Sequence, residues 1–263
     1  MRAAIYEVYG PPEVVTIRDV ETPVPQSDEI LIKVKAASVS SADWRMRSSE
    51  VPEGFGLIAP LIFGKKPKQK ILGSELSGVV FSVGDQVSNW KVGNEVVAFP
   101  GVKMGAHAEY ICLKASGKIV KKPAALSFEE AAALFFGGHT TLSFLERAGG
   151  IKPGMKVLVV GASGSVGSAT IQIAHHLGAE VTAVCSTRNS SLVRSLGASA
   201  VIAYDQEKFP PDSGSYDLIM DTIGTLGLKR GKELLRPGGK LLLVIASFGE
   251  MLRSVFSSAV IGG

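Results

Sequence analysis

The sequence has few cysteines, no long apolar run and no strong excess of one charge. Its 263 residues contain two cysteines, Cys112 and Cys185, far apart and each beside small or apolar neighbours. Two isolated cysteines exclude a disulfide framework and any zinc site that needs several thiolates. No segment reaches the roughly 18 consecutive apolar residues of a membrane-spanning helix, and the first ten residues lack the apolar core of a secretory signal. We therefore expect a cytoplasmic protein in a reducing environment.

The charge is only mildly positive. Lysine and arginine number 28 against 24 aspartates and glutamates, and the pI is near 9.0. The densest basic run, Lys65 to Lys70, contains a proline and no aromatic side chain that could stack on a base. We interpret this run as a solvated loop and do not expect nucleic-acid binding to be the function.

The composition and length fit a globular protein of two domains. Apolar residues make up 46% of the chain and charged residues 20%, a share typical of folded proteins. The first 122 residues are divided by Gly, Pro and Asp clusters into short segments rich in Val and Ile: 29–39, 77–83, 94–99 and 108–113. Short strands with regular turn signals favour an antiparallel barrel or sandwich.

The pattern changes at Pro123. Ser127 is followed three residues later by Glu130, which predicts a capping box at the start of a helix. From Lys156 onward apolar strands alternate with amphipathic helices, which indicates a parallel sheet covered on both faces. The strands are expected at 157–160, 181–184, 200–203, 218–221 and 240–245, and the helices at about 165–177, 189–196 and 226–235. We expect residues 1–122 and 123–263 to form separate domains.

A glycine-rich turn joins the first of these strands to its helix. Gly161 permits a tight turn, Gly164 lets a pyrophosphate approach the backbone, and Gly167 lets the helix lie close to the strand. Phosphates would then face the free amides at the helix N-terminus, among Ser163, Ser165 and Val166. The βαβ context predicts a dinucleotide site, with the apolar helix face formed by Val166, Ala169, Ile173, Ala174 and Leu177.

The end of the next strand indicates which dinucleotide binds. An acidic residue there would hold a ribose 2′-hydroxyl and mark NAD, but 181–203 contains no Asp or Glu. The strand instead leads into Ser186, Thr187 and Arg188, which can donate hydrogen bonds to a 2′-phosphate. We therefore predict NADPH as the cofactor. The alternative is that Arg188 only covers the surface and that the selectivity is loose.

Several segments together resemble the medium-chain dehydrogenase/reductase superfamily. Within it, the sequence is similar to the zinc-independent quinone oxidoreductase branch that includes zeta-crystallin and the alkenal reductases. The segments that carry the resemblance are 37–47 (ASVSSADWRMR), 72–80 (LGSELSGVV), 105–110 (GAHAEY), 138–142 (GHTTL), 161–167 and 236–239 (RPGG). The resemblance implies a GroES-like substrate domain over 1–122 and an α/β Rossmann NADP-binding domain over 123–263. Substrate and nicotinamide are expected in the cleft between them.

The resemblance also addresses the metal. Zinc alcohol dehydrogenases of this superfamily carry a cysteine near the Ser40 position and Gly-His-Glu where this chain has Gly73, Ser74 and Glu75. One carboxylate cannot build a catalytic zinc site of three protein ligands. We therefore expect no metal. Relatives commonly have Asn-Pro at Ser40 and Ser41, so no hydrogen bond of that asparagine is transferred to this chain.

The resemblance suggests catalytic positions on both sides of the cleft. Trp44 matches an often aromatic position beside the nicotinamide, with core packing as the alternative. Thr140 and Thr141 match a nicotinamide-contacting helix, although threonines inside a helix also bond to their own turn. His139 could donate a proton, because histidine titrates near neutral pH, or it could be structural.

Other positions are candidates on weaker grounds. Tyr204 corresponds to an adenosine-side contact or to packing, and His107 stands where relatives often have tyrosine. Thr225 and Ser247 follow strands at the carboxyl edge, where open α/β sheets bind ligands. His175 and His176 are expected to face outward with no role.

The resemblance implies hydride transfer from NADPH to a quinone or an α,β-unsaturated carbonyl. A non-catalytic binding protein, either NADPH-responsive or RNA-binding, stays open as the alternative. Relatives continue past the strand 240–245 through another strand that builds a dimer interface. We expect that strand to be absent here, which leaves an exposed apolar edge, and we expect the functional protein to be longer and homodimeric. The apolar residues expected to trail from that edge are Leu252, Val255, Phe256, Val260 and Ile261.

Overall fold

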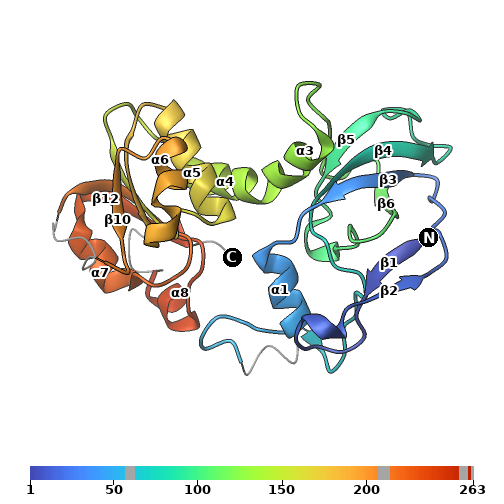
Figure 1. Cartoon of the computed structure of the whole chain (residues 1–263), viewed down its shortest axis with the longest axis horizontal. Coiled ribbons are helices and arrows are strands. Elements are labelled where there is room, and N and C mark those ends of the chain that lie inside the picture. Colours follow the sequence, from blue (N-terminus) through green and yellow to red (C-terminus); the bar gives the residue numbers. More distant parts are fainter. Residues whose placement is uncertain (57–62, 207–213, 255–259, 262–263) are drawn as a thin grey trace. The chain divides into compact units, whose positions relative to one another are not determined.

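A computed structural model describes residues 1–56, 63–206, 214–254 and 260–261 (Figure 1). The chain forms two compact units. The first comprises Met1–Val51 and Leu57–Phe136, and the second comprises Pro52–Gly56 and Gly137–Gly263. The short segment Pro52–Gly56 groups with the second unit because Phe248 donates its amide to the carbonyl of Glu53 and the rings of Phe55 and Phe248 meet edge to face.

The first unit is built on antiparallel strands, as expected from the short Val- and Ile-rich segments. Five strands lie in the order β6-β3-β4-β5-β7, and β1 pairs with β2 in a separate sheet. Their bounds are β1 (Arg2–Ile5), β2 (Thr16–Asp19), β3 (Glu29–Ala37), β4 (Leu76–Val83), β5 (Glu95–Ala98), β6 (Tyr110–Lys114) and β7 (Ile119–Lys121). Alternate side chains point inward, which places Ile30, Ile32, Leu76 and Val80 in the core.

A helix in this unit was not expected from the sequence. Helix α1 (Ser41–Ser48) begins with a capping box in which Asp43 accepts hydrogen bonds from the amide and hydroxyl of Ser40, at 2.7 and 2.9 Å. Among its residues only Asp43 is buried. A helix without an apolar stripe gives no periodic signal, so only its cap could have revealed it. The sequence analysis also did not predict the short 3₁₀ turns at Pro12–Val14 and Gly101–Lys103.

The predicted capping box at Ser127 is confirmed. Its hydroxyl accepts the Glu130 amide at 3.1 Å, and the Glu130 carboxylate accepts the Ser127 amide at 2.8 Å. Helix α3 (Phe128–Leu134) starts there, continues through one π-helical turn over Phe135–His139 and leads into α4 (Thr140–Arg147).

The second unit is a parallel sheet in the order β10-β9-β8-β11-β12-β13. Numbered from its first strand this order is 3-2-1-4-5-6, the doubly wound arrangement of dinucleotide-binding domains. The strands are β8 (Lys156–Val160), β9 (Glu180–Cys185), β10 (Ala200–Ala203), β11 (Tyr216–Asp221), β12 (Leu235–Leu243) and β13 (Val260–Ile261). The helices are α5 (Ser165–His176), α6 (Ser190–Ser195), α7 (Gly227–Leu234) and α8 (Phe248–Ser254), with a 3₁₀ turn at Thr187–Asn189. The predicted α/β fold is confirmed.

The buried face of α5 differs from the predicted one. Val166, Thr170, Ile171 and Ala174 are buried, whereas Leu177 at the helix end is 40% exposed. A threonine thus takes part in the packing, which a count of apolar residues alone does not register. The side chains of the two histidines at 175 and 176 are exposed, as expected.

The expected absence of a strand beyond β12 is wrong. Val260 and Ile261 form β13, which pairs in parallel with Leu242 and Leu243. This strand covers part of the edge that was expected to be exposed. Leu252 lies in α8 and is 57% exposed, whereas Val255 and Phe256 lie outside the described residues. In the described part of the chain, no helix has the length and apolar character to span a membrane.

Candidate functional site

The glycine turn after β8 has the geometry of a phosphate-binding loop. Gly161 has a φ of +75°, a left-handed conformation that side chains disfavour. A Cβ on Gly167 would overlap the carbonyl oxygen of Gly161 and lie 2.7 Å from the Cα of Ala162, so only glycine lets α5 lie against the turn. A Cβ on Gly164 would meet only the Gly161 carbonyl oxygen, at 3.4 Å. The Gly164 backbone is thus open to an approaching ligand.

The N-terminus of α5 is free to bind an anion. Gly164 is the N-cap and supplies no side-chain cap, and Gly164 and Ser165 are exposed. The first amides of a helix have no partner within it, and the helix dipole adds positive potential there. Val166 is buried beneath this surface. The turn therefore fits the pyrophosphate of a dinucleotide, with the backbone of 163–167 as the donor set.

A buried carboxylate beside this turn was not singled out by the sequence analysis. Asp221, at the end of β11, is fully buried and accepts the amides of Ile223, Gly224 and Leu226 at 3.1, 2.8 and 2.9 Å. The next residue, Thr222, donates its hydroxyl to the carbonyl of Val160 at 2.8 Å. These bonds fix the loop after β11 against the start of the glycine turn.

The strand end after β9 is tied to the glycine turn. The side-chain amide of Asn189 donates to the hydroxyls of Ser163, at 2.9 Å, and of Ser186, at 3.3 Å. This bridge places the residues predicted to recognise the 2′-phosphate next to the predicted pyrophosphate site. Arg188 lies on the exposed side of the 3₁₀ turn, with no ion pair to any residue that the structure describes.

Thr187 is already engaged by a carboxylate. Its amide and its hydroxyl both donate to Oδ1 of Asp205, at 2.9 and 2.8 Å. These hydrogen bonds lower the pKa of Asp205. Asp205 follows the next strand, β10, and so falls outside the segment 181–203 in which the sequence analysis looked for an acid.

The three other coenzyme candidates differ in their surroundings. Tyr204 is 60% exposed, so its ring is available to a ligand rather than packed in the core. Thr225 is exposed in the loop after β11. Ser247 caps α8: its hydroxyl accepts the Glu250 amide at 3.2 Å, and the Glu250 carboxylate accepts the Ser247 amide at 2.9 Å. Capping therefore accounts for Ser247.

Thr141 is buried between α4 and α5. Its hydroxyl lies 3.0 Å from that of Thr170 and 3.2 Å from the carbonyl oxygen of Val166. With no exposed surface, Thr141 holds α4 against α5. This geometry favours the structural alternative, with the bond made to the neighbouring helix rather than to its own turn. Thr140 is half-buried, and His139, on the π turn, is exposed.

Trp44 is presented on α1 of the first unit. Its side chain is 42% exposed, and the Arg45 guanidinium lies 5.4 Å from the ring centroid. The exposure argues against simple core packing. Asp43 beside it is 2% exposed and accepts the amide of Gly73 at 2.7 Å, which joins α1 to the Gly73–Glu75 segment.

The positions that carry zinc ligands in other branches do not fit a metal here. Ser40 donates its amide and hydroxyl to Asp43, and the Ser74 hydroxyl is buried with no partner among the described residues. The Glu75 carboxylate accepts hydrogen bonds from the Ser38 hydroxyl and, at 2.6 Å, from the Phe136 amide. No group of three His, Cys, Asp or Glu side chains in the described part of the chain could hold a metal ion.

Burial raises the pKa of Glu75, because desolvation of the carboxylate outweighs its hydrogen bonds. Nearby, Nε2 of His107 lies 2.8 Å from the Ser38 carbonyl oxygen, which indicates a structural role for this half-buried histidine.

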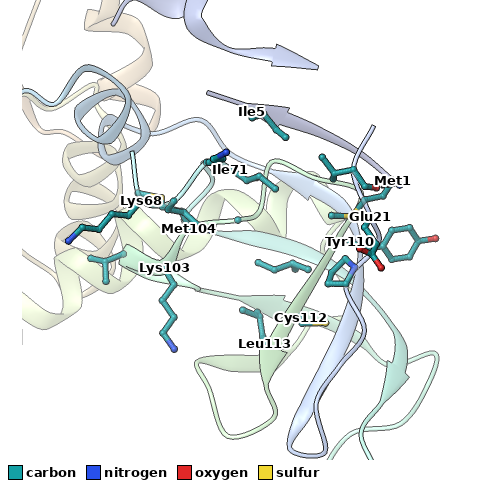
Figure 2. A pocket seen from close by; sticks show the side chains of 17 residues that line it. Met1, Ile5, Glu21, Lys68, Ile71, Lys103, Met104, Tyr110, Cys112 and Leu113 are labelled. Carbon is teal, nitrogen blue, oxygen red and sulfur yellow. Dashed lines mark hydrogen bonds between the residues drawn. The ribbon is translucent and has the colours of Figure 1, made fainter. Parts of the chain in front are cut away.

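An apolar pocket of about 800 Å³ lies elsewhere in the first unit, and Figure 2 shows Ile71, Met104 and Leu113 along it. It lies beside β1 and β6, and none of the predicted site residues lines it. The basic run borders the same region as a loop in which Lys65, Lys66, Lys68 and Lys70 are exposed, and Lys70 pairs with Glu7 at 2.9 Å. The interpretation of this run as a solvated loop is confirmed.

Comparison with known proteins gives consistent matches in both halves. Residues 26–124 match the alcohol dehydrogenase GroES-like domain, and residues 165–260 match the family described as zinc-binding dehydrogenase. The 2-methylene-furan-3-one reductase of Solanum lycopersicum is 33% identical over 97% of this chain and 68% of its own length. The quinone oxidoreductase of Mus musculus is 33% identical over 93% of this chain and 73% of its own length.

This chain covers a smaller share of some other relatives. It spans 60% of the human mitochondrial NAD(P)H oxidoreductase RTN4IP1, which is 35% identical over 85% of the chain. The solved structure of a quinone oxidoreductase from Coxiella burnetii superposes with a TM-score of 0.86 at 30% identity, covering all of this chain and 82% of that one. The glycine turn, the strand order and these matches agree: the chain belongs to the medium-chain dehydrogenase/reductase superfamily, in its quinone oxidoreductase branch.

Proposed function

We propose that this protein transfers a hydride from NADPH to a quinone or an α,β-unsaturated carbonyl without a metal. The observation that carries the proposal is the open Gly164 backbone at the uncapped N-terminus of α5, in a sheet with the strand order of dinucleotide-binding domains. In this proposal residues 123–263 bind the coenzyme and residues 1–122 form the substrate domain.

The acceptor class follows from the residues at the zinc positions. Ser40, Ser74 and Glu75 cannot polarise a ketone as a Lewis acid does, so simple ketones and alcohols are poor substrates in this proposal. A quinone gains aromaticity on reduction, and an enone delocalises the arriving charge into an enolate. Neither needs a metal. Relatives named quinone oxidoreductase and 2-methylene-furan-3-one reductase support both acceptors.

In this proposal the chain's own residues bind the coenzyme and orient the substrate. We assign the pyrophosphate to the backbone of 163–167, the adenosine side to Tyr204, and the 2′-phosphate to Arg188 with Ser186. We assign Trp44, whose ring is exposed, to the nicotinamide on the strength of the resemblance alone, and Thr225 lies on the carboxyl edge of the sheet. Thr141 positions α4 through its bond to Thr170 rather than touching substrate. His139 is the candidate proton donor, because its side chain is exposed on the π turn.

The location and assembly are proposed on the sequence and the resemblance. The two cysteines, of which Cys185 is buried and Cys112 half-buried, favour a reducing compartment, and we propose the cytoplasm. We propose that the protein is a homodimer, which light scattering of the purified protein would test.

The test is a substrate panel with NADPH as the reductant. Quinones and enals should be reduced, whereas simple alcohols should not be oxidised with NADP⁺. Chelation should leave the rate unchanged. Activity that disappears on chelation and returns with zinc would contradict the proposal, and so would turnover of alcohols alone.

A further inference from the structure

The coenzyme's ribose is expected to meet two opposing charges, and this inference rests on the proposed function. Arg188 can attract a 2′-phosphate, but the two hydrogen-bond donors of the neighbouring Thr187 are already taken. The Thr187 amide and hydroxyl, at 2.9 and 2.8 Å, both donate to Oδ1 of Asp205. A 2′-phosphate that uses these donors must either displace the Asp205 carboxylate or bind next to it against electrostatic repulsion.

The sheet register explains how a carboxylate reaches this place. Strands β9 and β10 are parallel neighbours, with Ala203 paired to Cys185. The pairing continues for one more bond, from the Tyr204 amide to the Cys185 carbonyl oxygen at 3.1 Å. Asp205 therefore leaves β10 beside the residues that follow β9. The acid that the end of β9 lacks is supplied by the neighbouring strand.

The carboxylate lies at the edge of the coenzyme site. Asn189 joins Ser186 to Ser163 of the glycine turn, so Thr187 stands next to the predicted pyrophosphate site. Asp205 is exposed, and both Thr187 donors bind the same oxygen, Oδ1, which leaves Oδ2 without a contact to Thr187. Its pKa is lowered by the Thr187 hydrogen bonds, so the group is charged at neutral pH.

We propose that Asp205 determines coenzyme specificity together with Arg188, by accepting a hydrogen bond from the 2′-hydroxyl of NADH and repelling the 2′-phosphate of NADPH. The two residues therefore act in opposite directions on the same position of the ribose. The preference for NADPH is then smaller than Arg188 alone would produce, and it increases when the carboxylate is neutralised.

The test compares the binding of NADPH and NADH by isothermal titration in wild type and Asp205→Asn. Asparagine keeps an oxygen for both Thr187 donors and removes only the charge. We expect the NADPH-to-NADH affinity ratio to rise about fivefold or more, the factor for one charge pair near contact distance in water. The gain should shrink at high salt, because exposed charges are screened.

Glu180→Gln is the matched control, since it removes one exposed carboxylate at the opposite end of β9 and should leave the ratio unchanged. If a thermal unfolding experiment shows that Asp205→Asn is not folded, Asp205→Ser is the second variant, because serine is a short uncharged acceptor. An unchanged ratio in a folded Asp205 variant, with both nucleotides bound, would overturn the specificity role alone. If neither nucleotide bound to the wild type, the proposed function itself would be wrong and the assignment of Asp205 would fall with it.

Discussion

At the scale of single residues, burial determines what a polar group can do. Asp43, Glu75, Thr141 and Asp221 are polar side chains almost without exposed surface, and each satisfies backbone or hydroxyl partners. Their hydrogen bonds hold helices and loops in place. The groups left for ligands are the exposed ones, such as Arg188, Trp44 and Tyr204.

Glu75 should make the stability depend on pH. Burial raises its pKa above the ordinary value of 4.5, so the folded state keeps this proton to a higher pH than the unfolded state. The free energy of unfolding therefore falls as the pH rises from about 4.5 through the raised value. Glu75→Gln should flatten this part of the profile in urea unfolding series. The exposed Glu129→Gln should keep it, and a wild-type slope in Glu75→Gln would show that another group is responsible.

Arg188 should matter for one coenzyme only. Its loss removes hydrogen bonds to a charged phosphate, so Arg188→Ala should weaken NADPH binding roughly tenfold to a hundredfold. NADH, which lacks the 2′-phosphate, should bind nearly as before. Isothermal titration with both nucleotides measures this difference. Equal losses for the two nucleotides would instead indicate that Arg188 supports the loop.

At the scale of elements, two glycines at the start of helix α5 have different roles, one in folding and the other in coenzyme binding. A Cβ on Gly167 would collide with Gly161 and Ala162, so Gly167→Ala should destabilise the fold by a few kcal/mol. A Cβ on Gly164 meets one oxygen at 3.4 Å, an ordinary contact, so Gly164→Ala should unfold like the wild type. It should nevertheless bind NADPH much more weakly, because the added methyl group occupies the approach of the pyrophosphate. Normal NADPH affinity in Gly164→Ala would place the phosphates elsewhere.

The elements also show which features the sequence could predict. The α3 cap at Ser127, strands β8 to β12 of the second unit and the glycine turn were predictable, because caps and continuous apolar runs are local signals, whereas the short strand β13 was not predicted. Helix α1 was not, since its only buried residue is the polar Asp43. The contact of Asp205 with Thr187 depends on the register of β9 and β10, and no local pattern reveals a register between strands.

At the scale of the whole molecule, coenzyme binding should stabilise the folded protein. A ligand that binds only the native state at a hundredfold excess over its Kd adds about 2.7 kcal/mol. NADPH should therefore raise the thermal unfolding temperature of the wild type. Gly164→Ala, at the same nucleotide concentration, should show little of this increase. An increase of the same size in both proteins would point to a nucleotide site other than the glycine turn.

The measurement that tests the central claim most directly is hydride tracing. NADPH carrying deuterium at both C4 positions is mixed with the protein and an enone, and the product is analysed by mass spectrometry. We predict one deuterium at the carbon β to the carbonyl, without added metal and at a rate sharply reduced in Gly164→Ala. If NADPH binds at the glycine turn, no deuterium reaches the β carbon of any enone and no quinone is reduced, the protein binds the coenzyme without turnover, and the proposed hydride transfer is contradicted.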